Sequence, residues 1–191
     1  HYTGVEAGYV NNPNDLGGET NHGITKAVAN KHKTILAQRF GWDGNVRNLN
    51  TPMAYYIYEV DYWNRVRGDD LLRIMPAIAD KMFDIAINMG TSRAVTYLQE
   101  FLNAMNNQSK LYLDLKVDGA IGNITISTLT TYATIRKVEG LKRLLHYLIA
   151  AQTHHYINIS LVREQNETFT YGWIGRAYDS AEEYVKLGML Y

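Results

Sequence analysis

The sequence of 191 residues contains no cysteine. Disulfide bonds, thiolate metal sites and cysteine nucleophiles are therefore excluded, and packing alone must hold the core together. Proteins of oxidising and of reducing compartments can both lack cysteine, so its absence indicates no compartment. Proline is also scarce, with only Pro13, Pro52 and Pro76, which leaves long stretches without a helix breaker.

The chain has no excess charge of either sign, because 19 Lys and Arg residues balance 19 Asp and Glu residues. Without a basic arm or an acidic tail, we expect no nucleic-acid partner. No apolar run approaches the roughly 20 residues of a membrane-spanning helix, and no signal peptide is visible. The sequence begins at His1 rather than at Met, which leaves open that an export or anchor segment has been removed.

Motifs for metals and cofactors are missing as well. The histidines at positions 146, 154 and 155 do not form the H-x-x-x-H pair of a helical zinc site. The G-x-S-x-G turn of serine hydrolases and the phosphate-binding and dinucleotide-binding motifs are also absent. We therefore expect neither a metal nor a cofactor.

What the sequence does contain is helical periodicity. Apolar residues recur at helical spacing over residues 51–66, 76–89, 92–105, about 136–163 and about 172–187. The first of these opens with a capping Thr51 and Pro52, and the second is expected to stop at Gly90. In the fourth, Gly140 costs about 1 kcal/mol relative to alanine inside a helix, so a start at Leu141 is the alternative. The fold class predicted from this pattern is mainly α.

Two segments interrupt the helical pattern. Residues 9–25, YVNNPNDLGGETNHGIT, are dense in Asn, Asp, Gly and Pro, which predicts a loop or a short hairpin. Residues 117–122, VDGAIG, form a second glycine-punctuated turn. The N-terminal segment is the one that offers chemistry.

Glu6 lies at the end of a short segment that reads as a first helix, with Gly8 as its stop. A carboxyl group there, desolvated by apolar neighbours, is favoured in its protonated form and can act as the proton donor of glycoside hydrolysis. Asp15 is the nearest candidate for a second carboxylate, and Thr20 can hold a water molecule. Spacing alone does not exclude a solvated helix end followed by an asparagine-rich turn.

The run from Glu6 to Thr25, EAGYVNNPNDLGGETNHGIT, resembles the signature of glycoside hydrolase family 108. That family includes N4-like phage endolysins and bacterial secretion activator proteins. Its usual form is EGGY, a proline-containing spacer and DPGG-x-T-x-x-GIT. Ala7 replaces the first glycine and Leu16 the proline, and neither change removes a chemical group. The order Glu, Asp, Thr is also similar to the catalytic set of T4-type phage lysozymes.

The resemblance continues along the chain. Residues 84–90, DIAINMG, resemble the family's D-x-x-x-N-x-G helix, and residues 54–63, AYYIYEVDYW, resemble its aromatic helix. The VDGAIG turn, together with Thr125, resembles a turn of a small peptidoglycan-binding lobe. The resemblance implies a lysozyme-like, two-lobed fold. Residues 1–90 would form the catalytic lobe, and residues 91–191 a helical lobe resembling a peptidoglycan-binding domain.

The resemblance implies an endolysin-type muramidase that hydrolyses the bond between N-acetylmuramic acid and N-acetylglucosamine, with inversion by analogy with T4-type enzymes. The implied catalytic set is Glu6, Asp15 and Thr20. Five further residues are candidates for substrate binding: Tyr9, His22, Asp84, Asn88 and Asp118. For most of them a structural role is the alternative. His22 would brace its loop, Asp84 and Asn88 would form a buried polar pair, and Asp118 would cap its own turn.

The expected partner is bacterial peptidoglycan, and we expect a monomer. The protein would be made in the host cytoplasm and act in the periplasm or on the cell wall. Two alternatives stay open. A lytic transglycosylase would use Glu6 alone and would not need Asp15. A peptidoglycan-binding or secretion-accessory protein would carry an inactive site.

Overall fold

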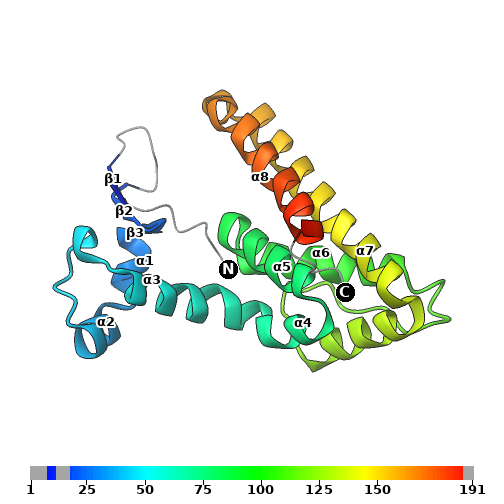
Figure 1. Cartoon of the computed structure of the whole chain (residues 1–191). Coiled ribbons are helices and arrows are strands. Elements are labelled where there is room, and N and C mark those ends of the chain that lie inside the picture. The colour runs from blue at the N-terminus through cyan, green and yellow to red at the C-terminus, as the bar shows by residue number, and fades with distance from the viewer. Residues whose placement is uncertain (1–7, 12–17, 187–191) are drawn as a thin grey trace. The chain divides into compact units, whose positions relative to one another are not determined.

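The computed structural model describes residues 8–11 and 18–186, so Glu6 and Asp15 lie outside the described residues. The chain is mainly helical, as the sequence predicts, with one small sheet near its N-terminus (Figure 1). It divides into two compact units, His1–Asp61 and Tyr62–Tyr191. The division into lobes at residue 90 stays a prediction, and the two units are described separately.

The N-terminal unit begins with the sheet. Strands β1 (Tyr9–Val10), β2 (Thr20–Asn21) and β3 (Ile24–Thr25) are antiparallel and neighbour one another in that order. Tyr9 pairs with Asn21, and Val10 pairs with Thr20. The segment expected to form a loop or short hairpin therefore folds as a hairpin with one added strand.

Two short helices follow, α1 (Lys26–Lys31) and α2 (Lys33–Phe40). The Oγ1 atom of Thr25 accepts a hydrogen bond from the Val28 N–H at 3.2 Å and thereby caps α1. Each helix buries a single apolar residue, Ala29 or Leu36, which is too little to give a readable hydrophobic period. Neither helix was predicted from the sequence.

The segment predicted as a helix over residues 51–66 is helical throughout, but it changes its winding. It comprises α3 (Thr51–Tyr58), a π-helical turn η2 (Glu59–Trp63) and a 3₁₀ turn η3 (Asn64–Val66). The predicted cap at Thr51 is wrong by one residue, because the side chain of Asn50 accepts the Met53 N–H at 3.1 Å. A 3₁₀ turn η1 (Val46–Asn48) precedes this segment.

In the C-terminal unit, α5 (Pro76–Met89) occupies the centre. It packs against α4 (Gly68–Ile74), α6 (Thr91–Ala104) and α7 (Asn123–Val162). The bounds of α5 and its stop at Gly90 are as predicted, and α6 is displaced by one residue from the predicted 92–105. The core of this unit is formed by fully buried side chains, among them Ile78, Met82, Ile85, Leu98, Leu102, Leu129, Leu144 and Leu148.

Helix α7 is longer than predicted, because residues 123–136 are helical as well. A kink at Lys137 separates this first half from the predicted second half. Gly140 lies inside the helix, where the Tyr132 hydroxyl donates to its carbonyl oxygen at 2.9 Å. A side chain at position 140 would collide with Tyr132 and Arg136, which explains the glycine.

The first half of α7 is rich in Ser, Thr and Ile, which are weak helix formers. Its hydroxyl groups donate to carbonyl oxygens three or four residues earlier, as in the bonds from Thr130 to Ile126 and from Thr134 to Thr130, both at 2.9 Å. Buried Thr125, Thr128, Leu129 and Tyr132 hold this half against the core. Tertiary packing thus overrides local propensity.

The last helix, α8 (Glu167–Lys186), packs along α7 after a 3₁₀ turn η4 (Glu164–Asn166). The predicted start near residue 172 is wrong, because the polar residues before it already form the 3₁₀ turn and the first turn of α8. Tyr184 of α8 is almost fully buried and joins the core.

Candidate active site

The motif segment places its described residues on the small sheet of the N-terminal unit. Thr20, a candidate catalytic residue, lies opposite Val10, and its hydroxyl donates to the Val10 carbonyl at 3.4 Å. Glu6 precedes β1 and Asp15 precedes β2 in the sequence, and both lie outside the described residues. The pairing of β1 with β2 places Tyr9 and Val10 beside Asn21 and Thr20.

Asn21 anchors the hairpin to the rest of the unit. Its side chain is buried, and its amide nitrogen lies 3.0 Å from the carbonyl oxygens of Val46 and Arg47 and 3.1 Å from that of Leu49. A buried amide is stable only when its polar atoms are bonded, and here they bind the strand to the turn at η1. The sequence gives no sign of this role, because the acceptors are backbone atoms.

Tyr9 is held between a carboxylate and a guanidinium group. Its hydroxyl donates to Glu19 Oε1 at 3.0 Å, and the Arg47 guanidinium carbon lies 4.4 Å from the ring centroid. The other Glu19 oxygen forms an ion pair with Lys26 at 3.5 Å. These contacts fix the ring beside the motif segment. A contact of Tyr9 with substrate stays a prediction.

His22 and Gly23 form the two-residue turn between β2 and β3. Both have positive φ, 51° and 73°, as the tight turn of a twisted hairpin requires. The Tyr58 hydroxyl donates to the His22 carbonyl at 2.9 Å and occupies the space that a side chain at position 23 would need. Among the described residues, His22 Nδ1 is the one buried side-chain polar atom without a hydrogen-bond partner. Its substrate contact stays a prediction.

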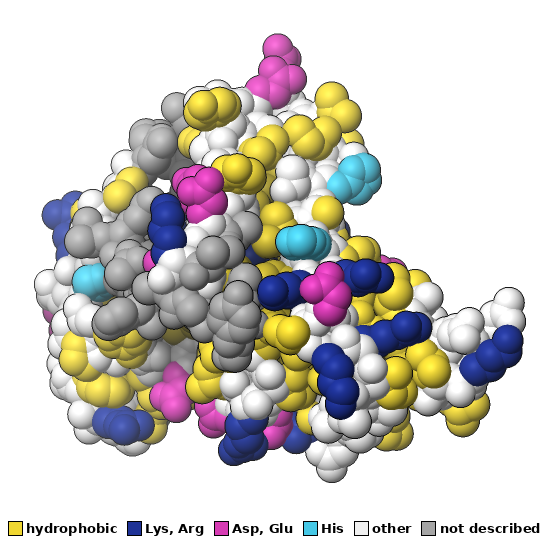
Figure 2. Space-filling model, turned by 45° about the vertical axis from the view of Figure 1, so that its right-hand side comes forward, with side chains coloured by type: hydrophobic (Ala, Val, Ile, Leu, Met, Phe, Trp, Pro, Cys, Tyr) yellow, Lys and Arg dark blue, Asp and Glu magenta, His cyan; other side chains and the backbone are white. Residues whose placement is uncertain are grey.

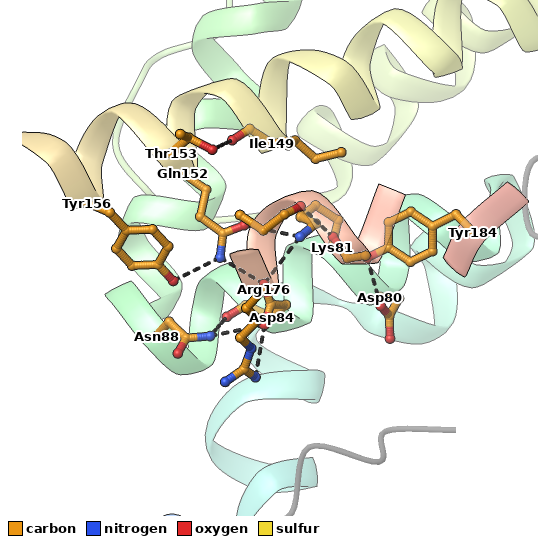
Figure 3. Close-up of polar contacts among 12 residues, drawn as sticks. Asp80, Lys81, Asp84, Asn88, Ile149, Gln152, Thr153, Tyr156, Arg176 and Tyr184 are labelled. Atoms are coloured by element: carbon orange, nitrogen blue, oxygen red, sulfur yellow. Dashed lines mark hydrogen bonds and ion pairs between the residues drawn. The ribbon is translucent and has the colours of Figure 1, made fainter. Parts of the chain in front are cut away.

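Asp84 and Asn88 lie on α5 in the C-terminal unit and are joined directly (Figure 3). The Asn88 amide donates to the Asp84 carboxylate at 3.0 Å. Lys81 and Gln152 also approach that carboxylate, at 3.3 Å and 2.8 Å, and Arg176 pairs with it at 3.1 Å. Protein donors thus engage both oxygens. This geometry favours the buried polar pair over a sugar contact, which stays a prediction.

The same cluster holds two strongly desolvated charges. Burial lowers the pKa of Lys81, although the neighbouring Asp84 carboxylate opposes this effect. Burial raises the pKa of Asp80, whose carboxylate accepts a hydrogen bond from Tyr184 at 2.8 Å. Figure 3 shows these groups joining α5 to α7 and α8. The arrangement fixes helices to one another through buried polar contacts.

Asp118 lies in the predicted VDGAIG turn and caps it. Its carboxylate accepts hydrogen bonds from the Gln99 amide and from the Ala120 N–H, both at 3.0 Å. These bonds, the Gln99 bond most of all, lower the pKa of Asp118. The Gln99 carbonyl oxygen in turn accepts the N–H groups of Asp118 and Gly119. These bonds favour the turn-capping alternative, and binding of the wall polymer by Asp118 stays a prediction.

The structure adds one pair that the sequence analysis missed. His32 Nε2 lies 2.8 Å from Asp61 Oδ2, and both side chains are largely buried. The Tyr56 ring meets His32 edge-on, with centroids 6.0 Å apart. The two residues are 29 positions apart, and neither lies in a motif, so no spacing signal marks them. This pair ties α2 to the helical segment that follows α3.

Within the described part of the chain, no three His, Asp or Glu side chains gather in a way that could hold a metal ion. None of the described helices combines the length and the apolar character that a membrane span needs.

Comparison with known proteins assigns both parts of the sequence. Residues 1–90 match the family model described as Glycosyl hydrolase 108, and residues 93–178 match the model described as Predicted Peptidoglycan domain. The chain is similar to a solved structure, SagA from Brucella abortus, with 28% sequence identity and a TM-score of 0.62. The match covers 95% of this chain and 87% of SagA. No curated protein sequence matches. The chain thus joins a region that matches the glycosyl hydrolase 108 family, residues 1–90, to a region that matches a peptidoglycan domain, residues 93–178.

Proposed function

We propose that the protein is a muramidase that hydrolyses the glycosidic bond between N-acetylmuramic acid and N-acetylglucosamine in peptidoglycan. The observation that carries the proposal is the match of residues 1–90 to a glycosyl hydrolase family, followed by a peptidoglycan domain. A hydrolase of glycosidic bonds that carries such a domain is best suited to the glycan strands of the wall. The two-lobe division, at residue 90, is part of this proposal.

In this mechanism Glu6 is the general acid that protonates the leaving oxygen. Asp15, with Thr20, positions the attacking water or stabilises the positive charge that develops on the sugar ring. The hairpin supports this assignment, because Glu6 precedes β1 and Asp15 precedes β2 in the sequence, and these two strands pair in one sheet. We infer inversion at the anomeric carbon, so the attacking water would come from the opposite face of the sugar.

Glu6→Gln tests the proposal. The amide keeps the size of the side chain but cannot deliver a proton, so we expect clearance of purified peptidoglycan to fall by about 10²-fold to 10⁴-fold or more. Glu19→Gln is the matched control, since Glu19 lies in the same motif and pairs with Tyr9 and Lys26. Clearance near the native rate by Glu6→Gln, with the melting temperature unchanged, would refute the mechanism.

The alternatives give different products. A muramidase adds water and leaves a reducing end, whereas a transglycosylase forms an anhydro sugar, so the mass of the released fragments separates them. Asp15→Asn should lower turnover strongly while leaving the melting temperature unchanged. Native turnover in Asp15→Asn together with anhydro products would establish the single-glutamate reaction. A native protein that binds peptidoglycan but releases no fragments would establish the accessory role.

A further inference from the structure

The C-terminal unit contains a pocket of about 510 Å³ between the end of α4 and the region of α7 around its kink. Its apolar wall is formed by Ile74, Met75, Ala133, Val138 and Leu141. The volume is within the range of small-ligand pockets and can hold a few amino-acid residues. All the residues that line it belong to the C-terminal unit, so the pocket does not depend on the N-terminal motif.

Lys137 lies at this pocket with an unusual backbone. Its φ of 57° and ψ of −160° fall in a region that is essentially restricted to glycine. A lysine stays in such a conformation only where its surroundings impose it, and these positions gather at ligand sites. The kink also shapes the pocket, because Ala133 lines it from before the kink and Val138 and Leu141 from after it.

Two cationic side chains, Arg73 and Lys137, line the same pocket. The Lys137 side chain is exposed and forms no hydrogen bond or ion pair with any described residue. Arg73 donates to Asp70 at 2.8 Å, but Asp70 is shared with Arg67, and the Arg73 side chain remains 74% exposed. One carboxylate thus faces two arginines, which leaves the rim positive. Figure 2 shows Lys and Arg side chains beside exposed apolar surface on one face of the molecule.

We propose that this pocket binds the short anionic peptide that branches from the glycan strands of peptidoglycan. The inference rests on the proposed function, because it takes peptidoglycan as the polymer on which the protein acts. Such a peptide presents alanine methyl groups that fit the apolar wall. It also presents free carboxylates that Arg73 and Lys137 can bind. Thr130 and Thr134 also line the pocket, and their hydroxyl oxygens, which donate to carbonyls of α7, can still accept N–H groups of the peptide backbone.

The test is a calorimetric titration of the full chain with the tetrapeptide L-Ala–γ-D-Glu–meso-diaminopimelate–D-Ala. The same tetrapeptide with all its carboxyl groups amidated should bind at least about fivefold more weakly, the size expected for loss of an exposed ion pair. Lys137→Gly should weaken binding of the acidic peptide by about fivefold on the same basis. Its melting temperature should be unchanged or higher, because glycine accepts this backbone without strain.

Two more variants complete the design. Ala133→Phe places a ring in the pocket and should abolish binding. Lys110→Gln removes an exposed cation that does not line the pocket and should leave binding unchanged.

Three results would overturn the proposal: no saturable binding by the native chain, unchanged binding after both Lys137→Gly and Ala133→Phe, or equal affinity for the amidated peptide. Decanoate is added as a competitor. If decanoate displaces the peptide at a similar concentration, the pocket is a lipid site and the peptide proposal is wrong. The tetrapeptide contains no glycosidic bond, so binding is measured independently of hydrolysis. If the protein does not cleave peptidoglycan, the muramidase proposal is refuted, but the peptide titration still tests the pocket. If the peptide does not bind, the pocket proposal is refuted, and the muramidase proposal still depends on the cleavage assay alone.

Discussion

At the scale of single residues, Asp118 shows how a motif aspartate can serve its own turn. Because its carboxylate binds the Ala120 N–H and the Gln99 amide, we expect Asp118→Ala to lower the melting temperature. Binding to insoluble peptidoglycan and cleavage of short soluble fragments should then fall equally. The measurements are thermal unfolding and a pull-down on purified walls. An unchanged melting temperature with loss of wall binding alone would instead assign Asp118 to the polymer.

Gln99 is the matched control for that experiment. It is buried and bonds four groups of the turn through its amide. Gln99→Ala removes the acceptor of the part-buried Asp118 and Gly119 N–H groups, so it should destabilise the protein by about 1 kcal/mol without any direct effect on a ligand. Equal behaviour of the two variants on both substrates would mark the turn as purely structural.

Single residues were predictable where a motif or a turn type marks them. The sequence placed Tyr9, Thr20 and His22 in a hairpin-forming segment, and the structure pairs the strands of that segment. It could not reveal Asn21 or the pair of His32 with Asp61, because their partners lie 25 to 29 positions away in the sequence. Such contacts depend on tertiary packing, which leaves no local pattern.

At the scale of elements, Asp84 links α5 to α7 and α8. In Asp84→Leu the buried Lys81 loses its ion-pair partner, so we expect a loss of about 3–5 kcal/mol in the free energy of unfolding by urea. Adding Lys81→Met to the same chain should recover part of the loss, because the unpaired charge is gone. A stable Asp84→Leu protein that no longer cleaves peptidoglycan would contradict the structural role and point to a substrate contact.

Asp80 on α5 gives a pH-dependent contribution. Burial raises its folded-state pKa above the ordinary value of 3.8, so the folded state retains the proton to a higher pH than the unfolded state. Its stabilising contribution is therefore complete below pH 3.8 and is lost as the pH rises through the raised folded pKa. Asp80→Asn should remove this dependence and still accept the Tyr184 hydrogen bond. Urea unfolding between pH 4 and pH 7 measures it, and identical pH slopes in both proteins would contradict it.

The helices whose bounds were predicted best are those with a regular apolar face between clear start and stop residues. Helix α5 has its bounds as predicted because its apolar residues, from Ile78 to Met89, recur regularly between Pro76 and Gly90. The first half of α7 was missed because its Thr and Ile residues favour extended structure, and burial of residues such as Leu129 overrides that preference. The short helices α1 and α2 bury too little to leave a pattern.

At the scale of the whole molecule, the boundary between the compact units falls inside a continuous helical segment, after Asp61. The division predicted from the sequence lies at residue 90, and the family models meet between residues 90 and 93. Helix α5 lies before that division, yet its side chains Ile78, Met82 and Ile85 belong to the core of the C-terminal unit. A periodic helical pattern cannot reveal such a boundary, because the pattern does not stop there.

Two fragments test which boundary matters for folding. Residues 62–191 keep α4 and α5 and should unfold cooperatively on heating, as a domain with its own core does. Residues 91–191 lose these helices and should show no cooperative transition, because the apolar faces of α6 and α7 are left uncovered. Circular dichroism during heating measures both. A cooperative transition in the shorter fragment would support the division at residue 90.

The row of Ser and Thr side chains along the first half of α7 also bears on how the molecule opens. Those hydroxyl groups bond carbonyls of their own helix, so they add little that would hold the segment in place when it separates from the core. A segment with low intrinsic helicity opens locally at a smaller free-energy cost, because only its packing against the core holds it in place. Amide hydrogens of residues 123–136 should therefore exchange with solvent sooner than those of residues 141–152, and the pocket wall at Ala133 lies within the segment that opens first.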